Sequence, residues 1–185
     1  MKRLLVLLLV LLITSTGFAQ GERMRLVKPK SSSEVLTLLQ LQRKPDLVAQ
    51  FNGQVWVAGT FVVRWPAGKD ARVYREPDYL LIPDSVSTAQ LPHFVYRDGS
   101  YVGSYKVRTI TVQNGKEAAG IAFVPGDVER ILQRKVNSVS VTGRFLIEAY
   151  SVGVECDAPW AKAVLVKAEL PGQLALAHRK VLEGC

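Results

Sequence analysis

Two stretches of the chain show the clearest alternation of apolar and polar residues. In residues 55–64 one face would carry Val55, Val57, Gly59, Phe61 and Val63. In residues 139–148 the corresponding face would carry Val139, Val141, Gly143, Phe145 and Ile147. A period of two residues is typical of strands with one buried face. Both stretches follow the pattern V-x-V-x-G-x-F, at an offset of 84 residues (139 − 55).

Helical signals precede and follow these strands. The capping box Ser31–Glu34 predicts a helix that buries Val35, Leu36, Leu38 and Leu39 and ends at Pro45. Asp46 then caps a second short helix over Leu47–Phe51, and Asn52-Gly53 turns the chain into the first long strand. After the break at Pro171-Gly172, a last helical face consists of Leu174, His178, Val181 and Leu182.

Shorter strands are predicted between and after the two long ones. Asp98-Gly99 and Asn114-Gly115 are dipeptides that favour two-residue turns, so each predicts a hairpin. Further strands are expected at residues 71–75, 79–82, 151–156 and 162–169.

The long strands indicate a fold class. Each is preceded by a short capped segment, beginning at Asp46 or Asp127, which suggests a duplicated helix-then-strand unit. Glycine within a strand packed on one face marks a bend or a close backbone approach, and such bends let a small sheet curl. In this feature the chain resembles the oligonucleotide/oligosaccharide-binding (OB) fold. We therefore expect a mainly β (α+β) protein of small, curled-sheet, OB-like barrel units with short helices.

Four segments are expected along the chain. Residues 1–19 read as a signal peptide, 20–33 as a flexible basic arm, 34–125 as a first OB-like unit, and 126–185 as a second unit with a C-terminal helix. No linker or charge block divides the part after residue 19, so the alternative is one domain that holds everything.

The first twenty residues predict export. Lys2 and Arg3 precede the apolar run Leu4–Ile13, and small residues at Gly17 and Ala19 suit cleavage after Ala19. The run is shorter than the roughly 20 residues that span a bilayer, and no second long run follows. We expect a periplasmic or secreted protein without a transmembrane span in its mature chain.

The charge limits the partners. The chain of 185 residues carries +8, and +6 remains once Lys2 and Arg3 leave with the leader. That excess favours anionic partners: acidic glycans, lipid phosphates or acidic proteins. In an exported setting nucleic acid is not an expected partner.

The two cysteines fit the same compartment. Cys156 and Cys185 form an even pair, and in an oxidising environment such a pair is most simply a disulfide. The bond would close a loop of 29 residues (185 − 156) and tie the C-terminus to the body of the fold. Trp160, close to Cys156, is expected either to shield this bond or to serve as an exposed anchor for a partner.

Signatures of catalysis are sparse in the sequence. The two histidines, His93 and His178, are expected to have structural or exposed roles, and no HExxH, GxSxG or phosphate-cradling glycine loop occurs. Glu155 and Asp157 offer only a weak case for hydrolysis. We therefore predict no catalytic, metal or cofactor site.

Aromatic and cationic residues alternate between residues 64 and 108. On a curled sheet they could form a surface that stacks on rings and attracts anions. Alternatively, the tyrosines are there as good strand formers and the arginines protect strand edges. The candidate binding surface consists of Arg64, Trp65, Arg72, Tyr74, Arg75, Tyr96, Arg97, Tyr101, Tyr105 and Arg108.

These features favour a non-catalytic binding protein of the cell envelope or secreted space. Its ligand would be an anionic glycan, a lipid headgroup or a protein. An inhibitor or immunity-type protein directed against an envelope enzyme is the second hypothesis, and an unrecognised hydrolase is the third.

Overall fold

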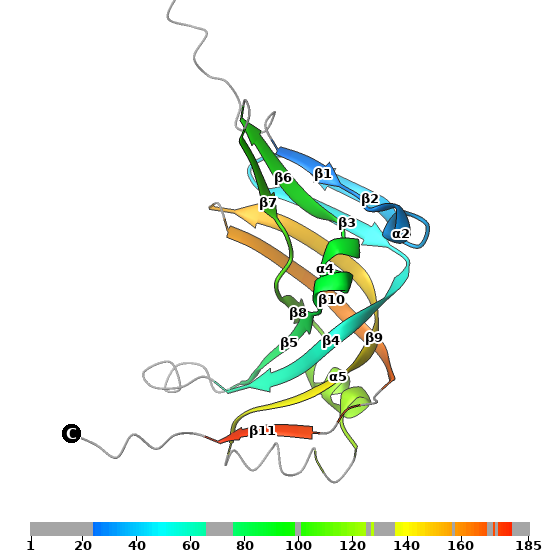
Figure 1. The fold of residues 1–185 in the computed structure, drawn as a ribbon, viewed down its shortest axis with the longest axis vertical. Coiled ribbons are helices and arrows are strands. Elements are labelled where there is room, and N and C mark those ends of the chain that lie inside the picture. The colour runs from blue at the N-terminus through cyan, green and yellow to red at the C-terminus, as the bar shows by residue number, and fades with distance from the viewer. Residues whose placement is uncertain are drawn as a thin grey trace, which may run out of the picture.

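A computed structural model describes residues 24–65, 76–98, 101–124, 127, 136–156, 158–169, 172 and 174–178. The described chain is mainly β, as predicted (Figure 1). Its strands are β1 (Met24–Val27), β2 (Thr37–Gln42), β3 (Leu47–Asn52), β4 (Gln54–Arg64), β5 (Asp78–Pro83), β6 (His93–Asp98), β7 (Tyr101–Tyr105), β8 (Ile110–Val112), β9 (Val136–Glu155), β10 (Ala158–Glu169) and β11 (Leu174–His178). Its helices are α2 (Lys30–Ser33), α4 (Ser85–Gln90) and α5 (Gly115–Ala122).

Five strands close into a barrel. The hydrogen-bonded order is β4, β5, β8, β10, β9 and back to β4. All of these pairs are antiparallel except β8 with β10, and α5 connects β8 to the segment that leads into β9. A closed five-stranded barrel of this kind is OB-like.

The two V-x-V-x-G-x-F strands are direct neighbours in this barrel. β4 and β9 pair antiparallel over their whole common length, with Val57 opposite Phe145 and Gly59 opposite Gly143. Strands from 34–125 and from 126–185 therefore share one sheet. Whether the two copies descend from a duplication stays a hypothesis.

β9 continues beyond the barrel. Its first part also pairs with β11, and its last part pairs with β3 and β10. β3 and β4 follow one another along the same edge of β9, joined at Gly53 with φ +106°, and β9 changes partner near Ala149 with φ +50°. With β2 paired to β3, the strands β10, β9, β3 and β2 form an extension of the barrel sheet.

A separate three-stranded sheet, β1–β6–β7, covers this extension (Figure 1). Phe94 of β6 is 1% exposed, and Tyr150 of β9 donates a hydrogen bond to the Pro92 carbonyl at 2.9 Å. The Tyr150 ring also lies against Phe51 of β3, with centroids 5.8 Å apart. The sheet β1–β6–β7 and the extension β10, β9, β3 and β2 therefore form two layers with a shared apolar interior. We call this two-layer part of the molecule the upper part.

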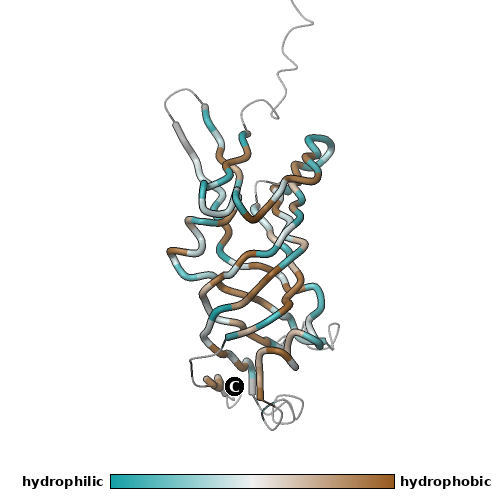
Figure 2. The backbone as a smooth tube through the Cα atoms, turned by 90° about the vertical axis from the view of Figure 1, so that its right-hand side faces the viewer, coloured by the Kyte–Doolittle hydropathy of each residue, from teal (hydrophilic) through white to brown (hydrophobic). Residues whose placement is uncertain are grey.

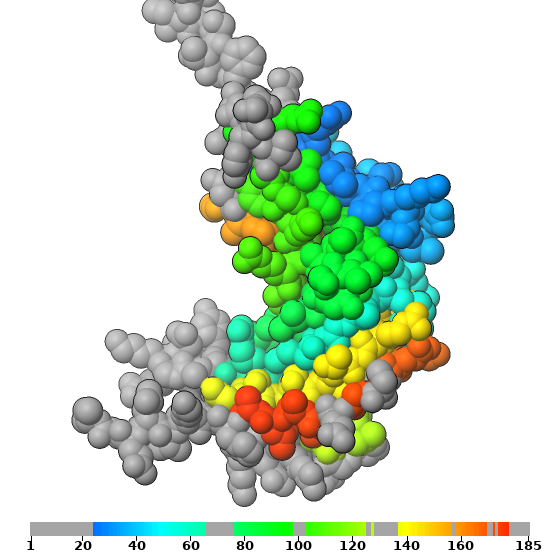
Figure 3. All heavy atoms as spheres, viewed as in Figure 1, coloured from blue at the N-terminus to red at the C-terminus, as the bar shows by residue number. Residues whose placement is uncertain are grey.

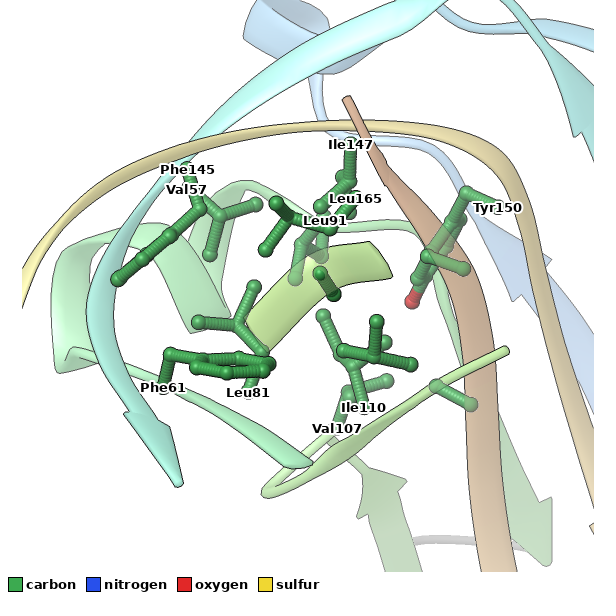
Figure 4. Packing of buried hydrophobic residues seen from close by; sticks show 14 of the residues in the cluster. Val57, Phe61, Leu81, Leu91, Val107, Ile110, Phe145, Ile147, Tyr150 and Leu165 are labelled. Atoms are coloured by element: carbon green, nitrogen blue, oxygen red, sulfur yellow. The ribbon is translucent and has the colours of Figure 1, made fainter. Parts of the chain in front are cut away.

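Hydrophobic and hydrophilic residues alternate along the chain (Figure 2), and the buried hydrophobic residues of the barrel strands form the core. Phe61 is fully buried, and its ring centroid lies 6.1 Å from that of Phe145 and 5.7 Å from that of Phe123 (Figure 4). α5 turns Ala118 and Ala122 into this core, so it closes one end of the barrel.

Several local predictions were wrong. The stretches predicted as helices at 34–44 and 47–51 contain β2 and β3, and Leu174–His178 is strand β11. β3 and β11 both pair with β9, and β2 joins the sheet by pairing with β3. This sheet pairing overrides the short helical patterns. Asn114-Gly115 begins α5 rather than a hairpin, and the expected arm at 20–33 contains β1 and α2.

Other predictions were confirmed. β6 and β7 form the hairpin predicted at Asp98-Gly99, with Asp98 opposite Tyr101. β5 and β10 include the strands expected at 79–82 and 162–169, and β9 includes the one expected at its end. The strand predicted at 71–75 and the helical segment from Val128 onward lie outside the described residues.

Candidate functional site

The candidate surface divides into two groups. Arg64 and Trp65 lie at the end of β4, whereas Tyr96, Arg97, Tyr105 and Arg108 lie on or beside β6 and β7. In Figure 1 the end of β4 lies in the lower part of the view, whereas β6 and β7 lie in the upper part. Arg72, Tyr74 and Arg75 fall outside the described residues, as does the side chain of Tyr101 in β7.

The group at the end of β4 is poorly suited to binding an anion. The Arg64 guanidinium pairs with the Asp78 carboxylate at 2.9 Å, and both side chains are more than half exposed (59% and 53%). Trp65 is half-buried and packs against the core. The Arg64 guanidinium therefore already has a carboxylate partner.

In β6 and β7 the alternation of the strands separates aromatic from cationic side chains. Tyr105 lies opposite Phe94, and Tyr96 follows Phe94 by two residues, so all three share the face that packs inward. Arg97 is on the other face and is exposed. In this hairpin the described rings and Arg97 therefore lie on opposite faces of the sheet.

The outer face of the three-stranded sheet is basic. Arg25 of β1 lies opposite Val95, two residues before Arg97, so the two arginines are diagonal neighbours roughly 7–8 Å apart. Both are exposed. We call basic face the outer face of this sheet with its flanking exposed cations: Arg25, Lys28, Lys30, Arg97, Lys106 and Arg108.

The charge of the described chain is distributed unevenly. Residues 24–34 and 93–108 hold six Lys/Arg and two Asp/Glu, a net charge of +4. The rest of the described residues hold seven Lys/Arg and nine Asp/Glu, a net charge of −2. Figure 3 shows that β6 and β7 contribute directly to the outer surface of the upper part.

Ion pairing sharpens this contrast. Among the residues that the structure describes, the ion pairs are Arg64–Asp78, Lys116–Glu76, Arg144–Glu169 and Lys167–Glu169. All lie on barrel elements or beside them. Within the same residues, none of the six cations of the basic face has a carboxylate within ion-pairing distance.

Two half-buried tryptophans with cations over their rings were missed by the sequence reasoning. Arg144 and Lys167 lie 5.1 and 5.8 Å from the centroid of the Trp56 ring on the outer barrel face. Lys162 lies 5.1 Å from the centroid of the Trp160 ring. These residues occupy outward-facing positions of β4, β9 and β10. The alternation of apolar and polar residues in the sequence could have identified such positions.

The cysteines, His93 and the acidic residues beside Cys156 were the other candidates from the sequence. Cys156 is exposed in the turn after β9, while Cys185 lies outside the described residues, so the disulfide stays a prediction. His93 is buried, with its Nδ1 3.0 Å from the Leu91 carbonyl oxygen, which is a structural contact. Glu155 is exposed, and Asp157 is not described.

Comparisons with known proteins do not assign the site. The chain matches no family model, and no curated protein or solved structure is significantly similar to it.

Within the described ranges, no cluster of three or more His, Cys, Asp or Glu side chains could hold a metal ion. In those ranges too, no helix has the length and apolar character needed to cross a bilayer.

Proposed function

We propose that this is an exported, non-catalytic binding protein that holds an anionic ligand of the cell envelope on its basic face. The ligand carries phosphate or carboxylate groups, as an acidic glycan or a lipid headgroup does. Export is the expectation from residues 1–19, and the proposal places the ligand in the same compartment.

One observation carries the proposal: the cations of the basic face make no ion pair with any described carboxylate, whereas most exposed barrel cations do. A cation already paired with a carboxylate must give up that partner to bind another anion. The basic face does not incur this cost. Its local charge of +4 also attracts anions over a Debye length of about 10 Å at 0.1 M salt.

The arrangement of Arg25 and Arg97 suits phosphate and carboxylate groups. A guanidinium presents a planar fork of donors that matches both groups. Two such forks on neighbouring strands of one sheet face can contact adjacent anionic groups of a ligand. Tyr105 supports this face from behind by packing on the core.

Binding to immobilised probes as a function of salt tests the proposal. Polyphosphate and dextran sulfate represent polymers, and vesicles with anionic phospholipid represent headgroups. The wild type should bind at least one probe, with an affinity that falls steeply with salt. Arg25→Gln/Arg97→Gln should weaken binding about tenfold or more. Lys116→Gln/Lys167→Gln, which removes the same charge from the barrel, should change it less than twofold.

Two results would contradict the proposal. One is no binding to any of these probes at low salt. The other is an equal loss in both double variants, because this would show dependence on net charge and not on the basic face. Recovery of one stoichiometric protein partner from the envelope fraction would favour the inhibitor hypothesis instead.

A further inference from the structure

The extension of the barrel sheet presents a second surface with different chemistry. Two adjacent rows of residues cross β10, β9, β3 and β2 on one face. The first row is Lys162, Ser151, Gln50 and Gln40. The second row is Trp160, Gly153, Val48 and Gln42. Directly opposed residues of antiparallel strands share a face, so these side chains are neighbours.

This face is the outer one. The residues between them, Ala161, Val152 and Ala49, are at most 2% exposed and line the interior of the two-layer part. Lys162, Gln50 and Gln40 are exposed. The surface therefore lies on the side of the upper part opposite to the three-stranded sheet. We call it the glutamine face, after Gln40, Gln42 and Gln50.

Trp160 forms a flat platform on the glutamine face. A Cβ atom at position 153 would come within 2.4 Å of the indole Cε2 and Cζ2 atoms, so the ring lies directly on the backbone of Gly153. The Lys162 Nζ lies over the same ring, 5.1 Å from its centroid. An aromatic face carries negative partial charge and attracts the C–H groups of a sugar ring. Because Lys162 is exposed and long, it can move aside for such a ring.

The polar groups beside the platform match sugar hydroxyls. Each glutamine amide both donates and accepts hydrogen bonds, as a hydroxyl does. Gln42 Nε2 donates to the Lys44 carbonyl oxygen at 3.3 Å, which orients its own carbonyl oxygen. The four strands span about 14 Å, at about 4.8 Å per strand, which is the length of a short oligosaccharide.

The charge of the glutamine face is close to balanced. Its two rows contain one cation, Lys162, and Glu155 lies on the same face one row beyond Gly153. A polyanion would gain little from this surface, whereas an uncharged sugar needs only the ring and the amides. We infer that the glutamine face binds an uncharged glycan chain, with one sugar stacked on Trp160 and its neighbours hydrogen-bonded to Gln40 and Gln50.

Titration calorimetry with uncharged hexasaccharides of glucose and of N-acetylglucosamine tests this inference. The wild type should bind one of them. Trp160→Ala should lower the affinity at least tenfold, and Gly153→Ala should lower it by lifting the ring from the strand. Gln40→Ala/Gln50→Ala should lower it several-fold. Trp160→Phe, which keeps a ring, should retain part of it.

Two controls make the result specific. Trp56→Ala removes the other tryptophan of the outer surface, and Arg25→Gln/Arg97→Gln removes the basic face; both should bind sugar like the wild type. Absence of saturable binding of both hexasaccharides at millimolar concentration would overturn the inference. Wild-type affinity in the Gln40→Ala/Gln50→Ala variant would also overturn it, and this exposed pair decides the matter even if Trp160→Ala does not fold. Because the anionic probes bear only on the basic face, the two proposals can fail separately.

Discussion

Gly59 and Gly143 lie directly opposite each other where β4 pairs with β9, and both are buried. The two V-x-V-x-G-x-F segments therefore meet at their central glycines. At Gly59 the backbone of the next strand also approaches closely, because a Cβ there would come within 2.9 Å of the Pro83 Cα and still closer to the Ile82 carbonyl oxygen. The glycine permits β4 to lie between β9 and β5 at the point where the barrel curls.

Replacing Gly59 by alanine should destabilise the protein. The added methyl group meets backbone atoms of Ile82 and Pro83, which cannot rotate away, so the two strands must separate. We expect a loss of about 2–3 kcal/mol in the free energy of unfolding, measured by urea denaturation.

Gly120→Ala is the matched control for that variant. Position 120 is inside α5 and has open space around its Cα, so alanine should raise stability by about 0.5–1 kcal/mol through helix propensity. If both substitutions changed the free energy of unfolding equally, the barrel would not depend on the close backbone approach at Gly59.

Much of the barrel could be predicted from the sequence because its strands alternate clearly. The long strands β4 and β9 have one buried face along most of their length, and the Asp98-Gly99 turn locates β6 and β7. β2 and β3 could not be predicted in this way. In β2 a register shift between Leu38 and Gln40 breaks the period of two, and it spaces Leu38 and Leu41 like residues of a helix.

The candidate site was predicted only in part. The sequence indicated that residues 64–108 combine rings with cations, and this region supplies Arg97, Lys106 and Arg108 to the basic face. It could not show that β1 adds Arg25 beside Arg97, because the pairing of Arg25 with Val95 joins residues 70 positions apart (95 − 25). The glutamine face could not be predicted for the same reason, since it depends on the pairing of β3 with β9, which joins Gln50 to Ser151.

Tyr150 should make stability depend on alkaline pH. Burial raises the pKa of its phenol well above the ordinary value of about 10. Above pH 10 the phenol therefore ionises in the unfolded chain but not in the folded one. The free energy of unfolding should fall by about 1.4 kcal/mol per pH unit from there upward.

The variant Tyr150→Phe isolates this effect. It loses the hydrogen bond to Pro92, about 1 kcal/mol at neutral pH, but its stability should decline less steeply above pH 10. Denaturation curves between pH 7 and pH 11 measure both changes. Parallel declines of wild type and variant would assign the alkaline loss to other groups.

The predicted disulfide can be examined by mass spectrometry of native protein. If Cys156 and Cys185 are bonded, neither should react with iodoacetamide until a reductant is added. Cys156 is exposed, so a free thiol there would be alkylated readily. Alkylation of both cysteines without reductant, in protein isolated from the envelope, would show that the disulfide does not form.

Asn114 joins the start of α5 to β10 through its side chain. Its Nδ2 donates to the Leu165 carbonyl oxygen at 2.9 Å, and its Oδ1 accepts from the Leu165 amide at 3.0 Å. The side chain thus replaces a strand partner for β10 between its two register shifts, and it holds the start of α5 against the barrel. Asn114→Ala should cost about 2 kcal/mol by urea denaturation, since the two hydrogen bonds to Leu165 and a longer, exposed one to Glu117 are lost. Asn114→Asp should cost at least as much, because a carboxylate would face the Leu165 carbonyl oxygen.

Gln113→Ala is the control, because Gln113 is a neighbouring exposed amide. It should change stability by less than about 0.5 kcal/mol. A loss comparable to that of Asn114→Ala would mean that the hydrogen bonds between Asn114 and Leu165 are not the cause.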